Sequence, residues 1–368
     1  MVGATPPADP AADFPTLADL EEAASRRTPP AVWGYVQGGA GEETAVAANR
    51  AAFRRRTIRP HVLAGLRTID LGTTLLQQGV GVPFFIAPTA YHGALHPDAE
   101  IGTARAAAGV RALAIFSTLS SCSLEQIAEA APEGRRWFQL YLQPDFKDTQ
   151  DLAARAERAG FTGLVLTADV PMLGVRDRQK RAGFAIDSSV PIGNGAHIRP
   201  PSRGPVWDGS QFSLREDASA SWDILDRLRS VTSLPLVVKG VLTAEDARRA
   251  AGSGASGIIV SNHGGRQLDC APATLDVLPE VAAAAGPKVE VYLDGGIRRG
   301  GDILLALASG AKAVGIGRPI LWALAVGGGV GVAQYLSVLR EELAMTMAFA
   351  GLSRISEITA ALLGPPRP

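Results

Sequence analysis

Short apolar runs recur along the chain, and each is followed by a segment of helical pattern. Apolar and polar positions do not alternate within these runs, which is typical of strands buried on both faces of a parallel sheet. Helical segments between them begin with capping patterns, Ser123 with Gln126 and Thr243 with Asp246. Eight such units predict an α/β fold, and they favour a closed (β/α)8 TIM barrel over an open doubly wound sheet. The predicted strands are 83–87, 112–116, 137–142, 163–167, 234–239, 257–261, 289–293 and 313–317.

The segments outside these eight strand–helix units are expected to belong to the same single barrel domain, 14–368. Residues 17–53 have helical patterning, interrupted by a glycine-rich bend at 33–41, and we expect this extension to cap one end of the barrel. Residues 1–13 are rich in Ala and Pro and predict a disordered tail. After the fourth strand, 177–221 is rich in Pro, Gly and Ser, which predicts a lid or a partly disordered loop.

Composition narrows the classes of partner. The 36 basic and 36 acidic residues balance, so nothing favours nucleic acid or an anionic membrane. Cys122 and Cys270 are too few for a disulfide framework or a cysteine-rich zinc site, and no metal site is predicted. The longest apolar run, 319–333, is interrupted by glycines, and its length predicts that it is too short to span a bilayer. No secretory signal is recognisable, so we expect a cytoplasmic protein.

The stretch S-N-H-G-G-R-Q-L-D, 261–269, is the strongest candidate for catalysis. It follows the sixth predicted strand, so His263 and Arg266 should project from the carboxyl end of the barrel, where TIM-barrel active sites lie. His263 could act as a base. Asp169, after strand four, could orient its imidazole and favour the protonated form.

Other polar residues at strand ends suggest a receptor for a small anion. Arg176 follows strand four and would meet Arg266 across the barrel mouth. A guanidinium group binds a carboxylate through two parallel hydrogen bonds, and tyrosine hydroxyls can add to them. The sequence therefore predicts a site that holds a carboxylate and moves a proton.

The last two strands are followed by loops suited to phosphate. These are D-G-G-I-R-R-G, 294–300, and G-I-G-R-P, 315–319. Barrels often bind phosphate with these two loops, although neither is a dinucleotide or Walker motif. Lys239, which ends strand five, could stabilise negative charge on a reduced flavin or form a Schiff base, and its neighbours favour the flavin.

These motifs resemble, in order, those of the FMN-dependent L-2-hydroxy-acid oxidase/dehydrogenase family, which includes glycolate, L-lactate and hydroxymandelate oxidases. The resemblance covers about 17–358. Its motifs are G-Y-V-Q-G-G-A, A-P-T-A, F-Q-L-Y, L-T-A-D-V-P, V-K-G-V, S-N-H-G-G-R-Q-L-D, L-D-G-G-I-R-R-G and G-I-G-R-P.

The resemblance implies a role for each matching residue. His263 would be the base with Asp169 as its partner, Arg176 and Arg266 would hold the carboxylate with Tyr35, and Tyr141 would bond the substrate oxygen. The FMN contacts implied are Thr89, Ala90, Ser117, Gln139, Thr167, Lys239, Ser261, Asp294, Gly296, Arg298, Gly317 and Arg318. A homotetramer is also implied.

The chain departs from plant glycolate oxidases at the substrate pocket. Leu119 stands where those enzymes have tryptophan, Val175 stands where arginine is common, and Tyr91 could also line the pocket. A larger pocket predicts that glycolate is not the best substrate, which leaves lactate, longer aliphatic acids and mandelate-like acids open.

The expected activity is FMN-dependent oxidation of an L-2-hydroxy acid to a 2-oxo acid, with O2 as acceptor giving H2O2. A dehydrogenase that passes electrons to a quinone or redox protein is the alternative, as is a non-catalytic flavin-binding protein. A diphosphate isomerase would need no carboxylate clamp. Cys270 as a nucleophile and His61, His92, His96 and His197 as functional groups are less favoured than structural roles.

Overall fold

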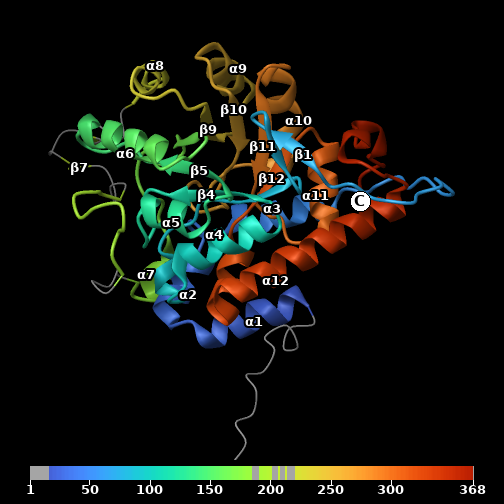
Figure 1. The fold of residues 1–368 in the computed structure, drawn as a ribbon, viewed down its shortest axis with the longest axis horizontal. Helices are drawn as coiled ribbons and strands as arrows, with labels where there is room; N and C mark the ends of the chain where they lie inside the picture. Colours follow the sequence, from blue (N-terminus) through green and yellow to red (C-terminus); the bar gives the residue numbers. More distant parts are fainter. Residues whose placement is uncertain (1–15, 185–189, 201–205, 208–211, 214–219, 368) are drawn as a thin grey trace, which may run out of the picture.

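Eight parallel strands close into a barrel in the computed structural model, which describes residues 16–184, 190–200, 206–207, 212–213 and 220–367. The predicted TIM barrel is therefore confirmed, and each predicted strand is present with ends shifted by a few residues (Figure 1). The strands are β3 (Phe84–Ile86), β4 (Leu113–Ser117), β5 (Arg135–Leu140), β6 (Leu164–Thr167), β9 (Leu236–Val241), β10 (Gly257–Val260), β11 (Glu290–Asp294) and β12 (Ala313–Ile316). Each pairs with its neighbour in chain order, and β12 pairs with β3 to close the ring.

Helices follow the strands and cover the outside of the barrel (Figure 1). Ser123 and Gln126 form the predicted capping box, and the Thr243 hydroxyl accepts from the backbone N–H of Asp246. The helices are α4 (Ala99–Gly109), α5 (Leu124–Ala130), α6 (Phe146–Arg158), α8 (Ile224–Arg229), α9 (Ala244–Gly252), α10 (Thr274–Ala285), α11 (Gly300–Ala308) and α12 (Arg318–Ala350).

A hairpin that the sequence pattern did not indicate closes the amino-terminal end of the barrel. It consists of β1 (Thr73–Leu75) and β2 (Gln78–Val80), which pair antiparallel. Its buried Leu75 and Val80 pack with the side chains that fill the barrel interior. The Leu76 N–H donates to Glu290, the first residue of β11, which fixes the hairpin at the strands' starting end. The carboxyl end of the barrel is therefore the end that can hold a functional site.

The amino-terminal extension is helical, as expected, but its central part differs. The three helices are α1 (Leu17–Arg27), α2 (Pro30–Gln37) and α3 (Thr44–Arg54). The prediction of a bend over 33–41 is wrong for its first half, because α2 continues to Gln37 and only the residues after it turn. Asn49 of α3 and Asn262 exchange hydrogen bonds of 2.8 and 2.9 Å, which ties the extension to the carboxyl end of the barrel.

The described parts of the segment 177–221 include regular secondary structure. It contains α7 (Asp177–Arg181) and a small hairpin of β7 (Val206–Trp207) and β8 (Phe212–Ser213). Between them, the Asn194 amide donates to the Thr118 carbonyl at 2.9 Å, so 190–200 packs on the loop after β4. The predictions of disorder within 185–189, 201–205, 208–211 and 214–219, and of the tail 1–13, lie outside the described residues.

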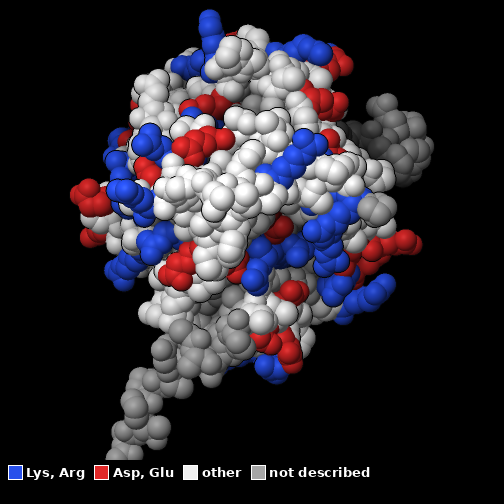
Figure 2. All heavy atoms as spheres, turned by 90° about the vertical axis from the view of Figure 1, so that its right-hand side faces the viewer, with Lys and Arg blue, Asp and Glu red and all other residues white. Residues whose placement is uncertain are grey.

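Helix α12 is longer than the apolar run suggested. By length and composition its 33 residues could cross a membrane, which corrects the expectation based on 319–333 alone. However, 50% of its most apolar 18-residue stretch is buried inside the protein, where α12 packs on α1, α4 and α11. Its backbone also departs from helical geometry at Gly327 and Gly328. Burial in the protein accounts for its composition. On the face of the molecule that lies at the right in Figure 1, acidic and basic side chains are interspersed, as the balanced charge predicts (Figure 2).

Replacing Leu75 by Ala should destabilise the protein by about 2–5 kcal/mol, because it leaves a cavity in the closed end of the barrel. Thr74→Ala, at the exposed position beside it, should change stability by less than about 0.5 kcal/mol. Urea unfolding followed by circular dichroism measures both. Equal stability of the two variants would contradict the hairpin's role as a plug.

Candidate active site

A cavity of about 590 Å³ opens at the carboxyl end of the barrel, between the βα loops, α2 and the α7 segment. A volume of this order is usual for cofactor and small-molecule sites. Every residue predicted to contact a substrate, together with His263, lines it: Tyr35, Tyr91, Leu119, Tyr141, Arg176 and Arg266. Of the predicted cofactor contacts, Thr89, Ala90, Ser117, Lys239, Asp294, Gly317 and Arg318 line it as well. Asp169, Gln139, Thr167, Ser261, Gly296 and Arg298 are not among the lining residues.

The predicted base and its partner are in contact. His263 Nδ1 lies 3.0 Å from Asp169 Oδ1, and among the described residues Nε2 is the ring nitrogen without a hydrogen-bond partner. Burial lowers the pKa of His263 below its usual value, and the nearby Lys239 lowers it further against the opposing effect of Asp169. Burial alone would raise the pKa of Asp169, yet Lys239 and His263 lower it overall. At neutral pH the pair is therefore a carboxylate and a neutral imidazole, which can accept a proton.

His263 is held on a strained turn. Its φ of 57° lies in the left-handed region, and Gly264 and Gly265 continue there with φ of 63° and 76°. Such a conformation costs a non-glycine residue on the order of 1–3 kcal/mol and requires support from its surroundings. The His263 N–H donates to Ser261 Oγ at 3.0 Å, and a Cβ on Gly265 would meet the Val46 nitrogen at 2.6 Å. Because Gly265 has no side chain, α3 can pack directly against the turn that orients the His263 imidazole.

Lys239 lies between Asp169, the partner of the base, and Asp294, one of the predicted cofactor contacts. Its Nζ lies 3.9 Å from Asp169 and 3.7 Å from Asp294, and it donates to Ser261 Oγ at 3.0 Å. Ser261 in turn donates to Asp294 at 2.6 Å. These contacts suit a charged ammonium group, whereas a Schiff-base lysine needs a neutral amine. The flavin interpretation of Lys239 is the one they favour.

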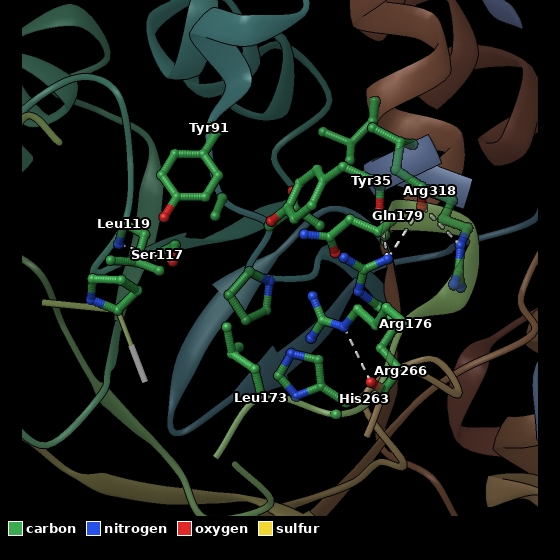
Figure 3. Close-up of a pocket in the computed structure, with 18 of the residues that line it drawn as sticks. Tyr35, Tyr91, Ser117, Leu119, Leu173, Arg176, Gln179, His263, Arg266 and Arg318 are labelled. Carbon is green, nitrogen blue, oxygen red and sulfur yellow. Dashed lines mark hydrogen bonds between the residues drawn. The ribbon is translucent and has the colours of Figure 1, made fainter. Parts of the chain in front are cut away.

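The predicted anion receptor consists of Arg176, which is buried, and Arg266, which is partly buried. Arg176 donates to the Arg266 carbonyl at 3.2 Å and to Gln267 Oε1 at 2.8 Å, and Arg266 donates to the carbonyls of Tyr35 and Gly38 at 2.7 and 2.6 Å. Burial lowers the pKa of Arg266, and Arg176 adds to this effect. Among the described residues neither guanidinium has a carboxylate partner, so the pair can receive one from a ligand. Figure 3 shows both groups beside His263.

A second pair of guanidinium groups, both partly buried, lies where the phosphate loops were predicted. Burial lowers the pKa of both Arg298 and Arg318 to about 10. Arg318 donates to the carbonyls of Val36, Gly264 and Gly38, whereas Arg298 lies 4.9 Å from the ring of Trp322. Within the described chain neither has an acidic partner. Together with the helix α12 that begins at Arg318, they suit a phosphate.

Two unpaired polar atoms on neighbouring barrel strands fit the ring of a cofactor. Gln139 Nε2 of β5 and Thr167 Oγ1 of β6 are buried and have no hydrogen-bond partner among the described residues. Ser117 donates to the other end of the Gln139 amide at 2.9 Å, which fixes its direction. Unpaired buried polar groups are costly, so a polar ligand edge is expected beside them. These residues therefore suit the flavin ring that the sequence motifs implied.

Sequence reasoning missed two residues of the site. Gln267, within the candidate motif, holds Arg176 and also donates to the Met172 carbonyl at 2.7 Å. Phe184 lines the cavity and stacks on Tyr35, in a segment that had no helical signal. By contrast, His92 is buried between Thr89 and Thr103, as a structural histidine would be, and Cys270 is exposed and away from the cavity lining.

Comparison with known proteins agrees with this arrangement. The model of the FMN-dependent dehydrogenase family matches residues 24–365. The chain belongs to this family. FMN is accordingly the cofactor that the cavity's phosphate and ring contacts serve.

Members of the FMN-dependent dehydrogenase family resemble the chain over nearly its whole length. L-lactate oxidase of Nostoc sp. is 43% identical over 94% of this chain and 97% of that oxidase. 4-Hydroxymandelate oxidase of Amycolatopsis orientalis is 43% identical over 93% and 96% of the two chains. A crystal structure of mandelate oxidase with (S)-2-phenylpropionate superposes with a TM-score of 0.86 at 41% identity, covering 95% of this chain and 98% of that one.

In the FMN-loaded protein, the pKa of His263 should lie below the ordinary histidine value of 6.5, because burial and Lys239 outweigh Asp169. Replacing Asp169 by Asn removes the one group that raises this pKa, so the pKa should fall further. Titration of ¹⁵N-labelled imidazole by NMR, with His263→Gln to assign the signal, measures both values. A pKa above 6.5, or a rise in Asp169→Asn, would contradict the described balance of charges.

Proposed function

We propose that this protein oxidises an L-2-hydroxy acid to the 2-oxo acid and returns the electrons to O2, giving H2O2. The observation that carries the proposal is the position of the His263–Asp169 pair beside two arginines that lack acidic partners, in one cavity. A base next to a carboxylate receptor is what removal of a proton from a 2-hydroxy acid requires.

The residues have separable tasks in this reaction. Arg176 and Arg266 bind the substrate carboxylate, with Tyr35 beside them, and so orient the C2 atom. His263 Nε2 accepts the proton that leaves the substrate, while Asp169 holds Nδ1 and stabilises the imidazolium. Burial raises the pKa of Tyr141, so its hydroxyl stays protonated and donates to the substrate oxygen.

FMN, when bound, accepts the two electrons of the substrate and passes them to the acceptor. Ser117, Gln139, Thr167, Ser261 and Lys239 would hold its ring. Its ribityl and phosphate groups would be held by Thr89, Ala90, Asp294, Gly296, Arg298, Gly317 and Arg318. Asp169 and Asp294 hold the ammonium of Lys239 in place, and it would supply positive charge beside the ring when the ring is reduced.

The part of the cavity that would hold the substrate's own side chain favours a substrate larger than glycolate. Leu119 and Tyr91 are buried in its wall, and Leu119 leaves the space that an indole would fill. The Tyr91 ring offers a face on which an aromatic acid can stack. We therefore propose L-lactate or a larger aliphatic or aromatic 2-hydroxy acid. The names of the similar lactate and hydroxymandelate oxidases support this class.

O2 is the proposed acceptor because these relatives are named as oxidases, as is 2-hydroxyacid oxidase 2 of Mus musculus, 40% identical to this chain. A quinone or a redox protein would be the acceptor in the alternative dehydrogenase. The cytoplasmic location, the absence of membrane attachment and the homotetramer expected from the sequence stay predictions.

Anaerobic stopped-flow mixing tests the reaction and its donor. L-lactate, glycolate, 2-hydroxyoctanoate and mandelate should each be mixed with the FMN-loaded protein, and bleaching of the flavin absorbance should follow with at least one acid other than glycolate. Admission of air should restore the colour with release of H2O2. His263→Ala should retain FMN but bleach at least about 100-fold more slowly, because the base is missing.

Failure of all four acids to bleach the wild-type flavin would contradict the proposed reaction. Slow reoxidation by air, with fast reoxidation by a quinone, would instead support the dehydrogenase. Normal bleaching of His263→Ala would remove His263 from the mechanism.

Replacing Leu119 by Trp should narrow the cavity and shift preference toward small acids. The ratio of kcat/KM for mandelate to that for glycolate should fall at least about tenfold, because a bulky side chain excludes the ring. Leu119→Met, of similar volume, is the matched control and should keep the wild-type ranking. An unchanged ratio in Leu119→Trp would refute the pocket argument.

A further inference from the structure

We infer that Phe184 is a positioning residue for Tyr35. The packing of α7 against α2 thereby determines the affinity of the site for a substrate carboxylate. This inference rests on the proposed function, in which Tyr35 assists carboxylate binding. It gives a task to α7 and the turn after it, a segment that the catalytic steps above do not use.

The ring of Tyr35 is held by packing on its faces and edge. Phe184 stacks on it, with ring centres 4.4 Å apart and planes within 16° of parallel. The guanidinium of Arg266 lies 4.9 Å from its centre, and Tyr91 is tilted against it at 5.9 Å. In the described part of the chain no hydrogen bond reaches the Tyr35 hydroxyl. Ring packing therefore determines where this hydroxyl points, into the cavity beside the arginines (Figure 3).

Phe184 reaches Tyr35 because two short helices pack very closely. A Cβ on Gly34 of α2 would lie 2.4 Å from the Ala182 Cβ, so glycine is required there for α7 to approach. Arg178 of α7 forms an ion pair with Glu43, with Nε and Oε1 2.8 Å apart, and this pair lowers the pKa of Glu43. Gly183, with φ of 68°, then turns the chain back so that Phe184 faces α2.

The contact has a specific energetic consequence. An offset-stacked aromatic pair contributes about 0.5–1.5 kcal/mol beyond the burial of its area. If this contribution fixes the Tyr35 hydroxyl, its loss should weaken carboxylate binding about threefold to tenfold. The chemical step should change little, because Phe184 contacts neither His263 nor Asp169 in the described hydrogen-bond and ring contacts.

A double-mutant cycle tests whether Phe184 acts through the Tyr35 hydroxyl. In the FMN-loaded protein, the Kd of oxalate, a small inert dicarboxylate, is measured from the change in flavin absorbance. The variants are Phe184→Ala, Tyr35→Phe and the double variant. Phe184→Ala should raise the Kd about threefold to tenfold, and it should raise KM for L-lactate with kcat within about twofold. In the Tyr35→Phe background it should have no further effect beyond about twofold.

A size swap between the helices tests the same idea at a distance from the ligand. Gly34→Ala should weaken oxalate binding as Phe184→Ala does, because the added methyl group displaces α7. Combining it with Ala182→Gly should restore binding, since the overlapping Cβ is removed. Phe184→Tyr keeps the stack and should bind oxalate normally, and Phe349→Ala, at an exposed position on α12, is the unrelated control.

Two results would overturn the inference. One is an unchanged oxalate Kd in Phe184→Ala, given normal FMN content and circular dichroism. The other is an equal loss in the wild-type and Tyr35→Phe backgrounds, which would show that Phe184 acts on the ligand directly. Failure of every 2-hydroxy acid to bleach the wild-type flavin would count against the proposed function, and the oxalate cycle would still test the stack.

Discussion

One buried ammonium group organises the carboxyl end of the barrel. Lys239 of β9 lies between Asp169, which follows β6, and Asp294, which ends β11, and it donates to Ser261, which follows β10. These four strands are neighbours in the ring. Buried carboxylates need a compensating charge, so the pairing holds the four strand ends together. The same cluster contains the hydrogen bonds that hold the strained His263 turn and orient its imidazole.

The arginines in and beside the cavity, unlike its acidic groups, have no partner of opposite charge in the described structure. The acidic groups near the base are already paired with Lys239 and His263, whereas the four arginines Arg176, Arg266, Arg298 and Arg318 meet only carbonyls, an amide or an aromatic ring in the described structure. Partly buried cations without acidic partners favour anions from outside. Arg176 and Arg266 lie beside the base, whereas Arg318 begins α12 and Arg298, which follows β11, contacts Trp322 of α12. This arrangement separates a carboxylate site from a phosphate site.

The sequence predicted the barrel and the strand-end chemistry because both depend on local patterns. Buried parallel strands are apolar throughout, and the residues after them share one end of the barrel, so His263, Asp169 and Lys239 could be placed together before any coordinates were known. Features that depend on tertiary packing were missed. α7 is too short to be stable alone, α2 contains a glycine that only its contact with Ala182 requires, and the β1–β2 hairpin is stabilised by the barrel end it closes. Phe184 and Gln267 acquire their roles only through those contacts.

The proposed activity requires that a base and a pair of arginines face one bound anion. A crystal structure of the FMN-loaded protein with a 2-oxo acid product would test this arrangement. The carboxylate should be bound by the guanidinium groups of Arg176 and Arg266, and the C2 oxygen should lie within about 3.2 Å of His263 Nε2. A carboxylate bound elsewhere in the cavity, with His263 out of hydrogen-bonding reach, would contradict it.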